Sequence, residues 1–208
     1  MNDHYRRLTR AATLLTILSL PVSAVQFGDY LTEDEAARIR EAQELYPRTK
    51  EYLHVVAARA AEIARRSGKA YEVKVPEEKE KKPKKIKKRK DGESAPTEPE
   101  NPLLFYQLPD IVNGISQSLK SIMINVDEKY KQKRSEPVEI VKALKLLQTF
   151  TAQDFQFLDD LEEKARNDQD EKLYRAVKNA RDSLERARDG AKDGLAVLEP
   201  QIESKKRK

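Results

Sequence analysis

Four stretches of this sequence repeat apolar residues at short, regular steps, and this spacing restricts the chain to helices that pack side by side. In the first stretch the steps alternate between three and four residues without interruption, at Ile39, Ala42, Tyr46, Thr49, Leu53, Val56, Ala60 and Ile63. Residues at this spacing share one face of a helix, and that face leaves water by packing on other helices. The pattern predicts an all-α protein.

The first helix carries its own start and stop signals. Thr32 and Glu35 form a capping-box pair, and Gly68 is a typical helix terminator. Pro47 interrupts the stretch, which allows either two separate helices or one kinked helix. Because the repeat keeps its phase across Pro47, we expect one first helix within residues 25–68, kinked at Pro47.

Residues 101–200 contain three further helical stretches. The apolar positions of the first are Ile111, Ile115, Leu119, Ile122, Val126 and Tyr130. The second runs to about Arg166 and has the widest apolar face, with Ile140, Val141, Leu144, Leu147, Phe150, Phe157, Leu158 and Leu161. The third has Leu173, Val177, Ala180, Leu184, Ala187, Ala191 and Leu198, and Pro200 is expected to end it. Since the two later connections are short, these three helices must alternate in direction. The long loop before them leaves the direction of the first helix open, and we expect an antiparallel, up-down four-helix bundle.

Residues 69–100 have a different composition from the helical stretches. Within residues 74–90, ten side chains are basic and three are acidic, and Pro, Glu, Ser and Thr dominate the remainder. This composition buries too little apolar surface to offset the entropy lost on ordering. We therefore expect a long disordered basic loop between the first two helices, although Tyr71, Val73 and Val75 alternate as if extended against the bundle.

The first 24 residues have the organisation of a secretory signal peptide. Three arginines precede an apolar run at residues 11–20, Pro21 ends that run, and Val22-Ser23-Ala24 supplies the small residues of a cleavage site. An uncleaved membrane anchor is the alternative, but residues 11–24 would span only about 21 Å as a helix, against about 30 Å of hydrocarbon. We expect export to the periplasm or the exterior, cleavage near Ala24, and no transmembrane segment in the mature chain.

The chain offers few groups for catalysis or metal binding. It has no Cys and two His, which excludes disulfides, thiolate metal sites and a Cys nucleophile. Glu51 and His54 match one Glu-x-x-His motif, whereas di-iron bundles need two copies and further carboxylates. Asp154 falls within an apolar face and is a candidate buried polar position. We expect no enzyme activity and no cofactor, with a metal- or haem-binding bundle as an alternative.

The remaining functional signal is a basic cluster between the first two helices. Its members are Lys79, Lys81, Lys82, Lys84, Lys85, Lys87, Lys88, Arg89 and Lys90. Because no aromatic residue lies among them, the cluster favours salt-sensitive attraction to anionic surfaces over specific recognition of bases. A second basic group, residues 201–208, forms the tail. A nonspecific nucleic-acid binder is the alternative function, and it requires the signal-peptide interpretation to be wrong.

One short segment carries a resemblance. Residues 27–35 (FGDYLTEDE) and 38–44 (RIREAQE) resemble the opening of exported bacterial helical proteins of uncharacterised function. The resemblance covers less than a tenth of the chain and implies no activity and no site residues. The hypothesis is a non-enzymatic protein of the cell envelope, in an interaction or structural role, which contacts a protein partner or an anionic envelope surface and takes no small-molecule substrate.

Overall fold

The structure is a computed structural model, and it describes residues 30–71, 73–76, 101–132 and 137–206. All regular structure in these residues is helical, which confirms the predicted all-α class, with six α-helices and one short 3₁₀ turn. Their bounds are α1 (Glu33–Glu41), α2 (Leu45–Ser67), η1 (Pro102–Phe105), α3 (Leu108–Lys131), α4 (Pro137–Thr151), α5 (Phe157–Asn167) and α6 (Glu171–Lys206). The predicted signal peptide and the basic cluster lie outside the described residues.

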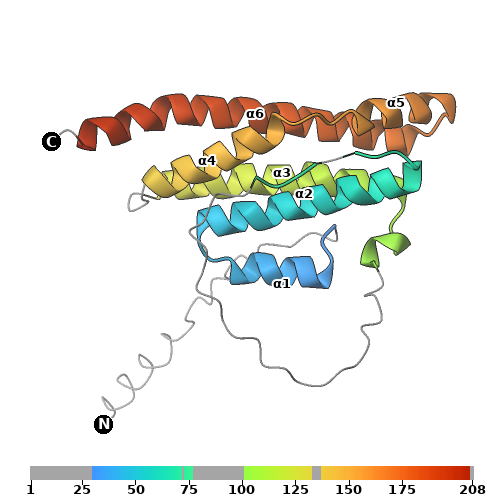
Figure 1. Ribbon diagram of the computed structural model, residues 1–208, viewed down its shortest axis with the longest axis horizontal. Coiled ribbons are helices and arrows are strands. Elements are labelled where there is room, and N and C mark those ends of the chain that lie inside the picture. The colour runs from blue at the N-terminus through green and yellow to red at the C-terminus, as the bar shows by residue number, and fades with distance from the viewer. Residues whose placement is uncertain (1–29, 72, 77–100, 133–136, 207–208) are drawn as a thin grey trace, which may run out of the picture.

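The helices lie side by side (Figure 1), and their buried apolar residues form one core. The extensive contacts join α3 with α6, α2 with α3, α4 with α6, and α2 with α4, while α1 lies against α2 and α5 against α6. The predicted apolar positions fill this core, and Leu53, Leu119, Leu147 and Val177 are fully buried. The core therefore follows the spacing of apolar residues along the sequence.

The first helical stretch is split rather than kinked, so the prediction of one helix kinked at Pro47 is wrong. The capping box at Thr32 is present, but α1 ends at Glu41 and α2 begins at Leu45. Glu139, at the start of α4, accepts a hydrogen bond from the Leu45 backbone N–H at 2.6 Å. This hydrogen bond stabilises the start of α2 by satisfying one of its free N–H groups. Pro47 then lies in the first turn of α2, where its missing N–H removes no helical bond.

The expected helix from residue 137 to about 166 is also divided. α4 ends at Thr151, and residues 152–156 separate it from α5. Arg188 of α6 donates to the Thr151 carbonyl through Nε at 3.2 Å and Nη2 at 2.7 Å. The guanidinium satisfies an end-of-helix carbonyl that a continuing helix would have used itself, and the chain turns there.

The last helix passes the residue that was expected to end it. α6 continues through Pro200 to Lys206, so residues 201–206 of the predicted tail are helical. Proline removes the bond that its N–H would give to the Ala196 carbonyl. Both Pro200 and Ala196 are exposed, so water can satisfy that carbonyl and the helix tolerates the proline near its end.

The chain that follows α2 turns back along the helices (Figure 1). The described residues 69–71 and 73–76 have no regular structure, but Tyr71, Val73 and Val75 pack on the core. The expectation from their alternation is confirmed. The disordered loop was predicted to begin at residue 69, whereas the structure holds the chain against the helices as far as residue 76.

Candidate functional site

The sequence-predicted site residues do not meet in one place. All nine residues of the basic cluster, Lys79 to Lys90, lie outside the described residues. Asp154 is described, and the expectation that it is buried is wrong, because it is exposed in the segment between α4 and α5. The helix that would have turned its side chain into the core ends three residues earlier.

The described chain on the N-terminal side of the basic cluster is held to the start of α5. Lys69 Nζ lies 2.8 Å from Asp160 Oδ2, and the Tyr71 hydroxyl donates to the same oxygen. The hydrogen bond from Lys69, joined by that from Tyr71, lowers the pKa of Asp160, while burial and the bond to Asp160 raise the pKa of Tyr71. The Tyr71 ring also packs on Phe157, with 5.7 Å between ring centroids.

A paired hydrogen bond continues this attachment. The Lys74 N–H donates to Gln153 Oε1 at 2.9 Å, and Gln153 Nε2 donates to the Lys74 carbonyl at 2.7 Å. The side-chain amide thus replaces the neighbouring strand that an extended residue would otherwise pair with. The chain enters the basic cluster from a fixed point on the α4–α5 connection.

The chain on the other side of the cluster is fixed to α2. Asn101 Nδ2 donates to Glu62 Oε2 at 2.9 Å, and Asn101 Oδ1 accepts from the Leu103 N–H at the start of η1. Arg66 of α2 donates to the Leu103 carbonyl at 2.7 Å and to the Tyr106 carbonyl at 2.9 Å. The turn lies beside the C-terminal end of α2 (Figure 1).

Glu62 is the centre of this second attachment. It is 2% exposed and binds Arg65 at 2.6 Å, Arg66 at 2.7 Å and Asn101. The hydrogen bond from Arg65, aided by Arg66 and opposed by burial, lowers the pKa of Glu62 to about 2. We did not predict this cluster from the sequence, although Glu62 has the i, i+3 and i, i+4 spacing to two arginines that is typical of ion pairs within a helix.

A buried ion pair joins α1 to α2. The Arg59 guanidinium, 1% exposed, binds Glu35 through Nη1 at 2.8 Å and Nη2 at 3.0 Å. It also donates to the carbonyls of Val55 and Tyr30. Burial acts to raise the pKa of Glu35, but the hydrogen bonds and charge of Arg59 dominate and lower it. Gly114 of α3 admits this side chain, because a Cβ there would lie 2.3 Å from Arg59 Nε.

The sequence also offered one metal-binding motif, and the structure does not bring its two residues together with other ligands. Glu51 forms an ion pair with Arg38 at 3.2 Å, and His54 is exposed on α2. No group of three or more metal-binding side chains occurs within the part of the chain that the structure describes.

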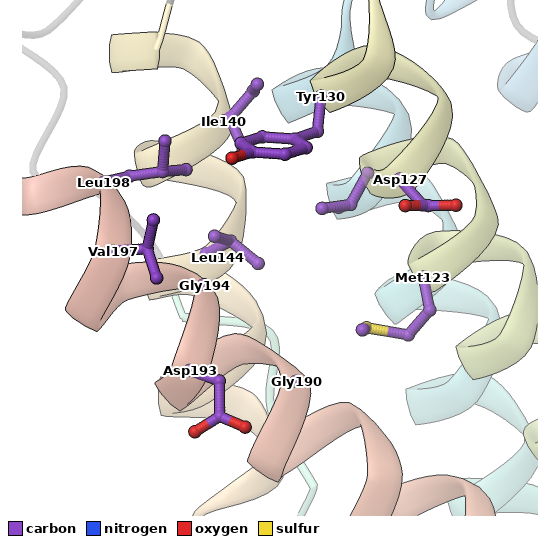
Figure 2. Close-up of a pocket in the computed structure, with 11 residues that line it drawn as sticks. Met123, Asp127, Tyr130, Ile140, Leu144, Gly190, Asp193, Gly194, Val197 and Leu198 are labelled. Carbon is purple, nitrogen blue, oxygen red and sulfur yellow. The ribbon is translucent and has the colours of Figure 1, made fainter.

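An apolar cavity of about 340 Å³ lies between the C-terminal half of α3, the first turns of α4 and the C-terminal half of α6. Figure 2 shows the Tyr130 ring at one end of the cavity and Met123 reaching toward α6. Asp127 and Asp193 are the charged residues of the lining; its apolar side chains include Met123, Tyr130, Ile140, Leu144, Val197 and Leu198. On α6, Gly190 and Gly194 complete the wall one helical turn apart.

Comparison with known proteins finds no relative of this chain. In the described ranges, none of the helices combines the length and the apolar character needed to span a bilayer. The resemblance of residues 27–44 to exported helical proteins stays a prediction. No protein-family model, curated protein or solved structure matches the chain.

Proposed function

We propose that this chain is an exported, non-enzymatic helical protein that presents its basic cluster to anionic surfaces of the cell envelope. The observation that carries the proposal is that both sides of the cluster are attached to the helices. Gln153 holds Lys74 on one side, and Glu62 with Arg66 holds Asn101 and η1 on the other. Nine positive side chains within residues 79–90 thus belong to a segment with two fixed ends.

The chemistry of the cluster supports a charged surface as the partner. Eight of its nine residues are lysines, which act as point charges rather than as planar, bidentate groups. Each lysine near an anionic lipid surface contributes about 1 kcal/mol of attraction, which salt weakens. The net charge of the whole chain is only +5, so the remaining residues do not reinforce this attraction.

The frame proposed for this role is a four-helix bundle whose successive members alternate in direction. Its members are α2, α3, α4 together with α5, and α6. The bond from Arg66 to the Tyr106 carbonyl, which joins the end of α2 to the approach of α3, supports an antiparallel pair. The bond between Ser116 and Ser183 at 2.8 Å and the approach of Met123 to Gly190 support a parallel pairing of α3 and α6. Paired spin labels on engineered cysteines test these directions, since the chain has no Cys.

Sedimentation with lipid vesicles tests the proposed function. Wild-type protein without residues 1–24 should sediment with phosphatidylglycerol vesicles at about 0.1 M salt and should separate from them at about 1 M salt. It should not sediment with phosphatidylcholine vesicles. A variant with glutamine at all nine basic-cluster positions should lose binding. The matched control replaces Lys205, Lys206, Arg207 and Lys208 with glutamine and should keep it. Equal, salt-insensitive recovery of all three proteins would refute the proposal.

Export has a separate test. We propose that cleavage follows Ala24, a site five residues before the first described residue. Mass spectrometry of the protein from fractionated cells should find a periplasmic or secreted chain that begins at Val25. An intact chain in the cytoplasm would refute export and favour a nucleic acid as the anionic partner.

A further inference from the structure

The cavity between α3, α4 and α6 is formed with the help of two residues that weaken their own helix. Glycine costs a helix interior about 1 kcal/mol relative to alanine, and α6 contains two of them, at 190 and 194. Neither is at a helix end, and neither has a positive φ. The backbone conformation therefore does not require glycine at these positions, and the side chains packed against them explain it.

Two neighbouring side chains occupy the space that the glycines leave. A Cβ at Gly190 would lie 2.4 Å from Met123 Cε, and one at Gly194 would lie 2.8 Å from Leu144 Cδ1. With glycine at these positions, the ends of Met123 and Leu144 lie close to the backbone of α6, and both side chains form part of the cavity wall. A Cβ at Gly190 would displace Met123 and one at Gly194 would displace Leu144, and because both side chains line the cavity, its shape would change.

The open side of the cavity combines exposed apolar groups with negative charge. Tyr130 is 54% exposed and Val197 is 52% exposed, although both belong to the lining. Asp127 is paired with Lys131 at 2.5 Å, whereas none of the described residues forms an ion pair with Asp193. The margin of the cavity thus offers a carboxylate without a counter-charge beside an apolar interior.

We propose that this cavity binds the alkyl chain of a single-chain amphiphile whose head group is cationic. An apolar cavity of about 150 Å³ is enough to bind benzene. A cavity of about 340 Å³ therefore has room for roughly a dozen carbon atoms. The alkyl chain lies against Met123 and Leu144, and the head group remains at the margin near Asp193. This site is independent of the basic cluster, whose charge would repel such a ligand.

Titration calorimetry with two probes of equal chain length tests the proposal. The protein without residues 1–24 is titrated with decyltrimethylammonium and with decanoate, both kept below the concentration at which they form micelles. The cation should bind at least about fivefold more tightly than the anion, because two unit charges 4 Å apart in water interact by about 1 kcal/mol. Failure of the cation to bind, or tighter binding of the anion, would overturn the proposal.

Two variants separate the interior from the margin. Gly190→Ala combined with Gly194→Ala should weaken both probes at least tenfold without lowering the melting temperature, because alanine favours the helix. Asp193→Asn should remove the preference for the cation and leave the anion unchanged or bound more tightly. The control Asp182→Asn, on α6 but outside this cavity, should bind as wild type.

The other possible outcomes of these experiments also support or refute the proposal. If the glycine variant binds as wild type and circular dichroism shows it folded, the probes bind elsewhere and the proposal is wrong. If that variant fails to fold, the aspartate variant still decides, since an unchanged preference for the cation refutes the assigned margin. Competition with a peptide of residues 79–90 tests the rival occupant: displacement of the cation by this peptide would assign the margin to the basic cluster.

Discussion

Replacement of Arg59 by methionine should be among the most damaging single substitutions in this protein. Methionine preserves much of the length of the side chain but leaves the Glu35 carboxylate buried without its bidentate partner. Removal of one member of a buried ion pair typically costs about 3–5 kcal/mol, because the other charge remains without compensation. Arg59 also donates to the carbonyls of Val55 and Tyr30, and both would lose this bond. We therefore expect the upper part of that range.

Urea unfolding followed by circular dichroism measures this loss. For a slope of about 2 kcal/mol per molar urea, a loss of about 4 kcal/mol lowers the midpoint by about 2 M. The matched control Arg38→Met removes an ion pair to Glu51 whose arginine is 55% exposed, and it should change stability by less than about 1 kcal/mol.

The double variant Glu35→Gln with Arg59→Met tests the cause. It removes the stranded charge, so it should recover at least about 2 kcal/mol of the stability that Arg59→Met loses. A loss below about 1 kcal/mol for Arg59→Met, or a double variant that is no more stable than Arg59→Met, would refute a buried, charge-compensated pair between α1 and α2.

Three further predictions concern stability. Glu62→Gln should destabilise the protein by about 2 kcal/mol at neutral pH. Because the pKa of Glu62 in the folded state, about 2, lies below the ordinary 4.5, the wild type should lose this advantage over the variant as pH falls from about 5 to 2; equal acid unfolding curves for the two proteins would contradict the assignment. Gly114→Ala should cost about 1–3 kcal/mol in urea unfolding despite the better helix propensity of alanine, because Arg59 is held at its far end and cannot yield; a stabilised variant would show that it can. Pro200→Ala should raise the melting temperature by restoring a helical bond, with a gain below about 3 kcal/mol, and a lower melting temperature would be the contrary result.

Apolar spacing and the capping box were sufficient to predict the helical class, most core positions and the start of α1. The helix breaks were not predictable in this way, because each depends on a contact that is distant in sequence. Glu139 is 94 residues from Leu45, and Arg188 is 37 residues from Thr151. Where the apolar pattern keeps its phase across such a break, it predicts one continuous helix. For this reason Asp154 was predicted to lie on the buried face of a helix.

The attachments on either side of the basic cluster also depend on contacts that the local sequence does not predict. The i, i+4 spacing of Glu62 and Arg66 is that of a pair within one helix, although we did not predict the pair. It did not indicate that Arg66 would donate to carbonyls of η1, since backbone acceptors carry no sequence signal. Gly190 and Gly194 are four residues apart and so share a helix face, but their neighbours on α3 and α4 follow only from the packing of the helices.

The position of Arg59 has a consequence for the order in which the chain assembles. Its guanidinium lies between the first helix and Gly114, so the pocket that receives it is complete only after α3 has been made and has docked. During synthesis, Arg59 follows Glu35 by 24 residues, so the ion pair can form early, but Gly114 is made only later, with α3, and until then the pair stays open to water on that side. The charges that join α1 to α2 are therefore enclosed only when α3 docks.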